Sequence, residues 1–168
     1  FDNAEIAGVL IAAAAGNTGS PRGKGNNVIY PARFDSVIAV AATDSSDKRA
    51  GFSSTGDQVE LAAPGAGIDS TLLGGGYGTK NGTSMASPHV AGAAALVFAT
   101  GIVDANGNGR VNDEVRLMLQ ATADDLGKTG RDNLFGFGLV DADEAAASIG
   151  PPNDAPTVSI TDPVDGDT

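Results

Sequence analysis

Continuous apolar runs alternate with longer mixed segments along this chain. Residues 8–15, 37–43 and 59–63 are apolar at nearly every position, which is typical of strands buried on both faces of a parallel sheet. Residues 83–100 and 112–123 have the length and residue content of helices. Strands that alternate with helices predict an α/β fold with a mostly parallel sheet.

Several shorter elements complete this pattern. Residues 83–100 are apolar around the whole helix, so we expect this helix to be central and buried. Two short arms around glycines predict a hairpin over residues 68–80, and residues 135–140 read as a short strand. We also predict the end of a helix at residues 1–7, a loop at 18–27 and a last helix at 141–148, capped by Asp141.

The character of the sequence changes after Gly150. We assign residues 1–149 to one domain and residues 150–156, which contain three prolines, to a linker. Residues 157–168 begin with an alternating strand pattern and resemble the start of a β-sandwich module of the immunoglobulin-like type. With no partner strands in this chain, we expect these last residues to be loose or extended.

Charge and composition exclude several classes of protein. The 168 residues include 10 basic and 21 acidic side chains, a net charge of −11, which opposes binding to nucleic acid. No apolar run approaches the roughly 20 residues of a membrane span. The chain has no Cys, so disulfides and thiolate metal sites are excluded.

The segment at residues 81–92, NGTSMASPHVAG, carries the strongest chemical signal. A glycine turn there delivers Ser84 to the first turn of the predicted helix 83–100. Free N–H groups and the positive end of the helix dipole favour negative charge that develops beside the hydroxyl, as a nucleophilic serine requires. The alternative is that Thr83 and Ser84 are simply helix caps.

The string GTSMASPHVAG at residues 82–92 resembles the nucleophile signature of the subtilisin-like serine proteases, the subtilases. Other matching strings follow in the family's order: AAGN at 14–17, YPA at 30–32, SVIAV at 36–40, FSS at 52–54 and APG at 63–65. The resemblance covers residues 5–148 and corresponds to the C-terminal half of a subtilase catalytic domain. It implies a three-layer subtilisin-like fold of which only that half is present.

The resemblance implies a role for individual residues. Ser84 would be the nucleophile, and Asn17 would donate its side-chain N–H₂ to the oxyanion together with the Ser84 backbone N–H. The substrate-binding residues would be Ala14, Ala15 and Gly16 in the wall of the specificity pocket, Ile29 at its floor, and Thr83 in support of the oxyanion site. Ile29 would make the pocket shallow and favour small or medium apolar side chains.

Three further expectations concern neighbours of these residues. The resemblance implies a cis peptide bond between Tyr30 and Pro31. Met85, adjacent to the nucleophile, should be the oxidation site that limits activity. His89, the one histidine of the chain, lies five residues beyond Ser84 and points some 140° away on a helix, so it cannot act as the base.

In the family, the Asp and His of the catalytic triad lie upstream of the oxyanion Asn. We therefore expect the N-terminal half of the same catalytic domain to be a partner, besides protein or peptide substrates. The resemblance implies a secreted or cell-surface bacterial serine endopeptidase. The alternatives are an inactive piece of a protease and a non-catalytic scaffold or binding module.

Residues 104–114, DANGNGRVNDE, resemble a calcium-binding loop. Position 12 departs from that pattern because Val115 stands where an acid is expected, so Asp113 or Glu114 would have to substitute. The alternative is an Asn-Gly-rich turn. The resemblance also suggests a different cation site, at the carbonyls of Ala32, Phe34 and Val37 near Glu60. The candidate ligands in the loop are Asp104, Asn106, Asn108, Arg110 through its carbonyl, Asn112 and Glu114.

Overall fold

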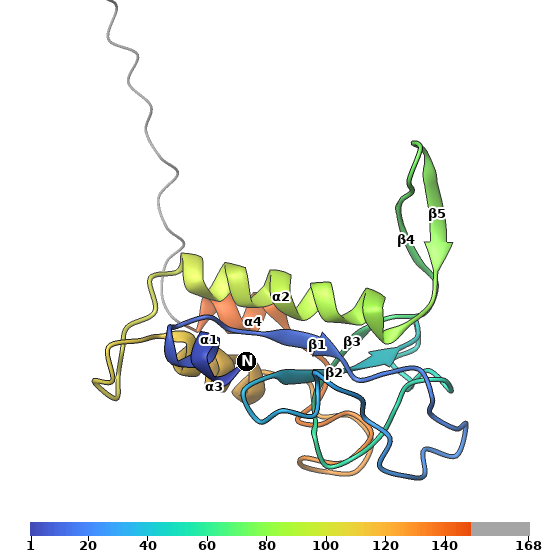
Figure 1. Cartoon of the computed structure of the whole chain (residues 1–168), viewed down its shortest axis with the longest axis horizontal. Coiled ribbons are helices and arrows are strands. Elements are labelled where there is room, and N and C mark those ends of the chain that lie inside the picture. Colours follow the sequence, from blue (N-terminus) through green and yellow to red (C-terminus); the bar gives the residue numbers. More distant parts are fainter. Residues whose placement is uncertain (149–168) are drawn as a thin grey trace, which may run out of the picture.

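The computed structural model describes residues 1–148, in which a three-stranded parallel sheet packs against a long helix. The strands lie in the order β1-β2-β3: β1 (Ala12–Ala14), β2 (Ile38–Thr43) and β3 (Val59–Pro64). The helices are α1 (Asp2–Ile6), α2 (Thr83–Ala99), α3 (Asn112–Ala121) and α4 (Ala142–Ala147). In Figure 1, α2 runs along one face of the sheet, with α4 beside it. The predicted α/β class with a parallel sheet is confirmed.

The two faces of the sheet are covered differently. Side chains such as Ile38, Val40 and Leu61 belong to the apolar cluster that includes the buried residues of α2, α3 and α4. The opposite face, which includes Ala41 and Ala62, packs against loop residues. Within residues 1–148, helices therefore cover one face of the sheet and loops cover the other.

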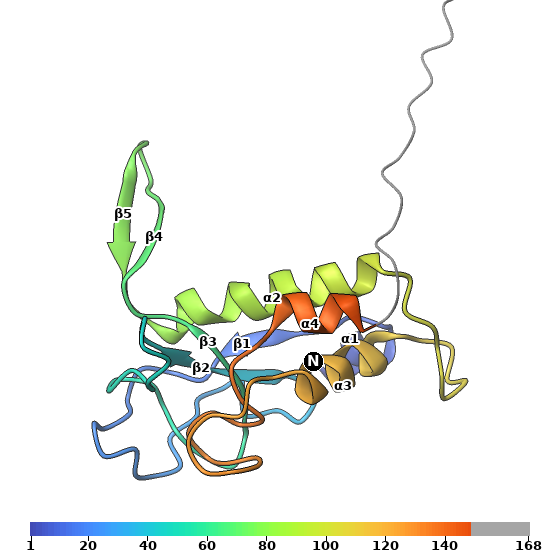
Figure 2. The same cartoon turned by 180° about the vertical axis from the view of Figure 1, so that it is seen from behind.

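The segment between β3 and α2 forms the predicted hairpin. Its strands β4 (Ile68–Thr71) and β5 (Tyr77–Lys80) pair in antiparallel fashion, with Ile68 opposite Lys80. The hairpin projects away from the body of the molecule next to the start of α2, as Figures 1 and 2 show from opposite sides.

Two predictions of complete burial are wrong. The apolar run 8–15 forms a strand over Ala12–Ala14 alone, and these residues are half-buried. Helix α2 buries one side, but its other side exposes Pro88, Ala91, Ala95 and Leu96 to solvent. Both deviations lie at the β1 edge of the sheet. Within the described residues, β1 has a neighbouring strand on one side only, so neither β1 nor the side of α2 beside it is fully covered.

The strand predicted at residues 135–140 does not form. Leu139 makes isolated bridges with Ala62 and Asp124, and Gly136 adopts a left-handed conformation (φ +67°) that interrupts an extended run. The segment still covers the edge of β3, since Phe137 N–H donates to the Glu60 carbonyl at 2.8 Å.

The ends of the other elements agree well with the sequence pattern. Asp141 caps α4 by accepting a hydrogen bond from the Glu144 N–H at 2.8 Å, as predicted. None of the helices in residues 1–148 is long and apolar enough to span a membrane. The linker expected at residues 150–156 and the sandwich strand expected at 157–168 lie outside the described residues.

Candidate active site

Ser84 is the second residue of α2 and is exposed to solvent. The helix begins directly after Gly82, so Ser84 lies where backbone N–H groups have no partner within the helix and the dipole is positive. Ser84 Oγ makes no hydrogen bond within residues 1–148. The hydroxyl is therefore free and stands in a field that favours a neighbouring negative charge.

Asn17 is fixed to the start of α2 by its side-chain oxygen. Asn17 Oδ1 accepts hydrogen bonds from the Thr83 backbone N–H at 2.9 Å and from the Thr83 hydroxyl at 3.0 Å. The same hydroxyl accepts from the Gly16 N–H at 3.1 Å. Thr83 is completely buried, and its hydrogen bonds join the end of β1 to the start of α2. Because Oδ1 accepts both bonds, the amino group of Asn17 remains available as a donor.

The two candidate oxyanion donors border a common space next to Gly82. A methyl group built on its Cα would lie 3.3 Å from Asn17 Nδ2 and 3.7 Å from the backbone nitrogen of Ser84. The two nitrogen atoms therefore border the same space, and a side chain at residue 82 would enter it. Met85 Sδ also borders this space, at 3.6 Å from that point.

His89 does not act on Ser84 in this arrangement. Its ring nitrogen Nδ1 lies 2.8 Å from the Met85 carbonyl oxygen one turn back on α2, and the residue is exposed. A pocket of about 480 Å³ lies between this first part of α2 and the hairpin; Ser84, Met85, Pro88 and His89 contribute to its lining. Within the described residues, no side chain that could act as a base forms a hydrogen bond with Ser84 Oγ.

Comparison with known proteins agrees with this geometry. The sequence model of the subtilase family matches residues 1–138. The chain belongs to the subtilase family. It is 47% identical over 145 residues to subtilisin E of Bacillus subtilis (strain 168), an alignment that covers 86% of this chain and 35% of that protein.

Two further relatives give the same picture for this subtilase. Subtilisin of Bacillus pumilus is 46% identical over 145 residues, covering 86% of this chain and 49% of its own. Alkaline elastase YaB of Bacillus sp. (strain YaB) is 44% identical over 144 residues, covering 86% and 34%. The chain spans between about a third and a half of the length of these curated relatives.

The residues expected around the specificity pocket of the subtilase lie together. Ala15 is buried, and its carbonyl oxygen accepts a hydrogen bond from the Ile29 N–H at 3.0 Å. The Ile29 side chain is half exposed and lies against Gly16, next to Asn17. The peptide bond between Tyr30 and Pro31 is cis, as predicted. The floor role of Ile29 stays a prediction.

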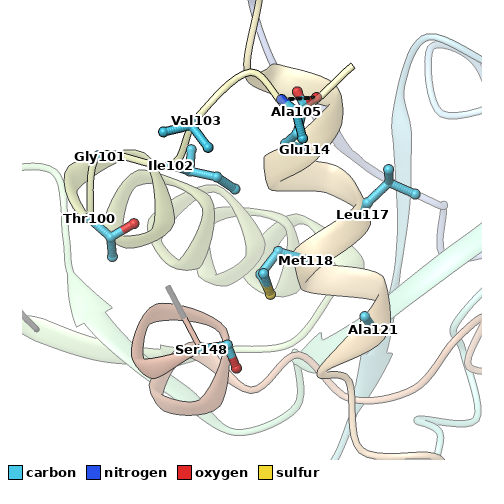
Figure 3. A pocket seen from close by; sticks show the side chains of 10 residues that line it. All are labelled: Thr100, Gly101, Ile102, Val103, Ala105, Glu114, Leu117, Met118, Ala121 and Ser148. Carbon is cyan, nitrogen blue, oxygen red and sulfur yellow. Dashed lines mark hydrogen bonds between the residues drawn. The ribbon is translucent and has the colours of Figure 1, made fainter. Parts of the chain in front are cut away.

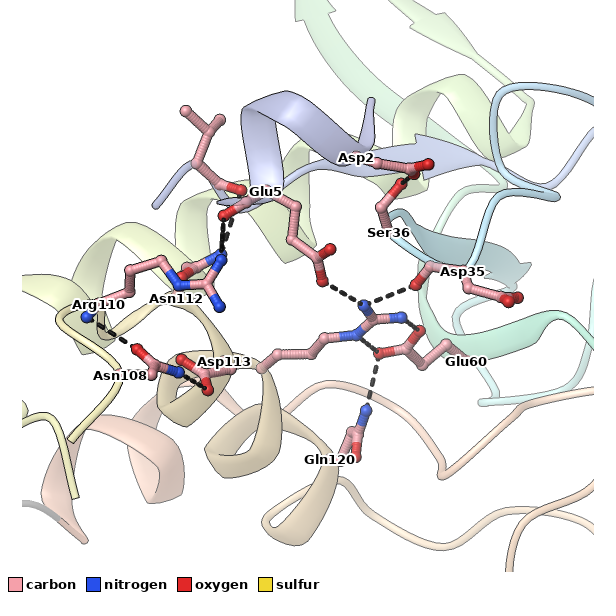
Figure 4. A network of polar contacts seen from close by, with 12 residues as sticks. Asp2, Glu5, Asp35, Ser36, Glu60, Asn108, Arg110, Asn112, Asp113 and Gln120 are labelled. Atoms are coloured by element: carbon pink, nitrogen blue, oxygen red, sulfur yellow. Dashed lines mark hydrogen bonds and ion pairs between the residues drawn. The ribbon is translucent and has the colours of Figure 1, made fainter. Parts of the chain in front are cut away.

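A polar network on α3 surrounds Glu60, the acidic residue near the second predicted cation site. Arg116 donates from Nε to Glu60 Oε1 at 2.6 Å and from Nη2 to Glu60 Oε2, while Gln120 donates to Oε1 at 2.8 Å (Figure 4). The hydrogen bonds to Glu60 raise the pKa of Arg116, although burial opposes this. Glu60 is thus paired with Arg116, and the cation site at the carbonyls of Ala32, Phe34 and Val37 stays a prediction.

Only some of the residues predicted as calcium ligands point into the loop, whereas two point toward α1. Asp104, Asn106 and Asn108 lie in the loop, and Glu114 faces its beginning. The side chains of Arg110 and Asn112 instead turn toward α1, where both donate to the Glu5 carbonyl, at 3.3 and 3.0 Å. Their place among the ligands stays a prediction.

Two residues of these sites, Gly82 and Asp113, are more prominent in the structure than the sequence pattern predicted. Gly82 borders the space between the candidate oxyanion donors, and a glycine directly before a helix that starts with Ser was the available signal. Asp113 accepts hydrogen bonds from both loop asparagines, although the spacing of the calcium pattern favoured Asn112.

Proposed function

We propose that this subtilase is the nucleophile-bearing part of a serine endopeptidase. The observation that carries the proposal is that Asn17 Nδ2 and the backbone nitrogen of Ser84 border the same space next to Gly82. Two preorganised donors at such a place stabilise the oxygen of a tetrahedral intermediate, which is usually the largest contribution to acyl transfer.

The reaction follows from these groups. Ser84 Oγ attacks the carbonyl carbon of the peptide while a base removes its proton, and the C=O electron pair moves onto the oxygen between Asn17 and Ser84. Collapse of this intermediate breaks the C–N bond, and the amine leaves with the proton from the base. Water then hydrolyses the ester on Ser84 by the same steps.

The base is proposed to come from an N-terminal half of the same catalytic domain. His89 is bound to its own helix, so an imidazole from outside this chain has to serve Ser84. The exposed side of α2 and the half-buried β1 support a partner at this edge. They flank an apolar groove of about 190 Å³ that includes Leu10, Ala12 and Ala95.

Substrate preference and location are proposed from the same family relationship. Ile29 beside Gly16 would leave room for small or medium apolar side chains in the specificity pocket. The Bacillus origin of the relatives named above supports a bacterial protein. We propose that it acts outside the cell or at the cell surface.

Covalent labelling tests the assignment of the nucleophile. The chain is mixed with a separately produced N-terminal half of the domain and treated with a fluorophosphonate, which should phosphonylate Ser84 Oγ with loss of fluoride. Peptide mass spectrometry should find the adduct on the peptide that contains Ser84. Ser87 provides the matched control because it lies in the same helical turn and its hydroxyl donates to the Ala12 carbonyl.

Labelling should persist in Ser87→Ala and disappear in Ser84→Ala. An adduct on a different residue, or equal labelling of Ser84→Ala, would contradict the proposed nucleophile.

A further inference from the structure

The loop between α2 and α3 is wrapped around the carboxylate of Asp104. Asp104 Oδ1 accepts hydrogen bonds from the N–H groups of Gly107 at 2.7 Å and Asn108 at 3.1 Å, and Oδ2 accepts from Gly109 at 2.7 Å. Gly109 adopts a left-handed conformation (φ +82°), which the sixth position of a calcium-binding loop requires for its sharp turn.

Two amides and a second carboxylate converge in the same loop. The side-chain amino groups of Asn106 and Asn108 each donate to Asp113 Oδ2 at 2.7 Å; Figure 4 shows the second of these bonds. The other carboxylate oxygen of Asp113, Oδ1, is buried and has no hydrogen-bond partner in the described residues.

Glu114 carries a second observation that points to a cation near the loop. The residue is 8% exposed, and its Oε1 accepts hydrogen bonds from the N–H groups of Ala105 at 3.2 Å and Asn106 at 3.3 Å; Figure 3 shows the first of these bonds. Its Oε2 is buried and has no hydrogen-bond partner within residues 1–148. A buried carboxylate oxygen without a partner is costly, and a positive charge beside the loop would compensate it.

The donor atoms identify the chemical class of the ligand. Three carboxylates and two amides offer hard oxygen ligands, which suit calcium or magnesium rather than softer metals. Within the described range, no three His, Asp or Glu side chains converge closely enough to hold a metal by themselves. Amide and backbone oxygens must therefore complete the shell, and such mixed, flexible coordination is typical of calcium.

We propose that the loop over residues 104–114 binds one calcium ion through Asp104, Asn106, Asn108, Asp113 and Glu114. The amide oxygens of Asn106 and Asn108 can take part because each accepts a single hydrogen bond, from Asn108 N–H at 3.0 Å and Arg110 N–H at 2.8 Å. Each oxygen therefore keeps a second lone pair.

Calcium would stabilise the junction of three elements rather than the catalytic centre. Asn112 donates to carbonyl oxygens of Glu5 and Val9, so the loop is tied to α1 at the point where α3 begins. The loop also forms one side of an apolar pocket of about 520 Å³ with α3 and Ser148 (Figure 3). Ser84 lies at the other end of α2, about 25 Å away along the helix.

Nuclear magnetic resonance can test the site without any measurement of activity. The ¹⁵N-labelled chain is stripped of metal and titrated with calcium chloride. Backbone signals of Gly107 and Gly109 and the side-chain signal of Asn108 should shift and saturate, with a dissociation constant between about 10⁻⁵ and 10⁻³ M. The Ser84 backbone signal should remain in place, and magnesium should bind more weakly.

Two variants that preserve shape give the decisive comparison. Asp113→Asn and Glu114→Gln should each weaken calcium binding at least about tenfold, since each removes one ligand charge. Asp143→Asn, on the exposed side of α4, should bind as the unaltered protein does. If the chain associates too strongly for spectra, the same set is compared by calcium-dependent shifts of melting temperature in the complex with the N-terminal half.

Absence of saturable shifts at about 10 mM calcium would overturn the proposal, since this exceeds the range of the weakest loops of this kind. Unchanged calcium affinity in both loop variants, or equal affinity for magnesium, would overturn it as well.

Discussion

The two edges of the parallel sheet differ in how completely this chain covers them. At the β3 edge, the segment 135–140 bonds to the strand, and the residues of β2 and most of β3 are buried. At the other edge, β1 is half-buried and an apolar groove runs between it and the exposed side of α2. Both candidate oxyanion donors belong to elements of this second edge, since Asn17 follows β1 and Ser84 begins α2.

The difference shows which part of the site the chain builds by itself. The hydrogen bonds of Thr83 hold Asn17 and Gly16 against the start of α2 across 66 and 67 residues of sequence. These bonds need nothing from beyond β1. One side of α2 is exposed beside β1, and Ser84 forms no hydrogen bond with a base among the described residues. We therefore expect the base and a cover for α2 to arrive together across the β1 edge.

The largest expected effect concerns Asn17, the candidate oxyanion donor that follows β1. Asn17→Ala should lower kcat of the reconstituted enzyme about 10²–10³-fold, the loss that such a donor carries in subtilisin itself, because the oxyanion loses one hydrogen bond. KM should change little, since the bond strengthens in the transition state. Steady-state kinetics on a peptide substrate provide the measurement, and a change in KM with constant kcat would contradict this role.

A smaller effect is expected at the β1 edge of the sheet, where the apolar groove lies. Ala95→Arg places a long charged side chain in the groove beside β1, so the affinity for the N-terminal half should fall at least about tenfold. Ala147→Arg, exposed on α4, serves as the matched control and should leave the affinity unchanged. Titration calorimetry or anisotropy measures both. Equal affinities in the two variants would show that the partner docks elsewhere.

The smallest effect concerns Met85, which borders the space between the two donors. Its sulfoxide would be polar and larger there, so peroxide should lower activity in step with oxidation of this residue. Met118, on α3 at the other end of the molecule, is the internal comparison. Activity of Met85→Ala should resist peroxide, whereas inactivation at the rate of the unaltered enzyme would exclude Met85 as the sensitive site.

The sequence pattern predicted those features that depend on local rules. The buried runs of β2 and β3, the hairpin around three glycines, the Asp141 cap and the place of Ser84 in a first helical turn all follow from neighbouring residues. The family resemblance added the cis bond before Pro31, which local rules do not specify.

Features that depend on distant or external contacts could not be predicted in this way. Apolar periodicity cannot tell whether both sides of α2 are covered within the same chain, so its exposed side was missed. The run at 135–140 has the residues of a strand, but the left-handed conformation of Gly136 breaks it next to the hydrogen bond from Phe137 N–H to the Glu60 carbonyl. The pair of Arg116 and Glu60 joins residues 56 apart, and no pattern in one sequence links them.

We propose, as the centre of this interpretation, that this chain holds a nucleophile and oxyanion donors and receives its base from across the β1 edge. Hydrolysis of a chromogenic peptide, measured for the chain alone and after addition of a separately produced N-terminal half, tests it most directly. We expect no protease-like turnover by the chain alone. After mixing, we expect cleavage that Ser84→Ala abolishes and His89→Ala retains. Robust turnover by the chain alone that is lost in Ser84→Ala, whether or not His89→Ala affects it, would contradict the claim.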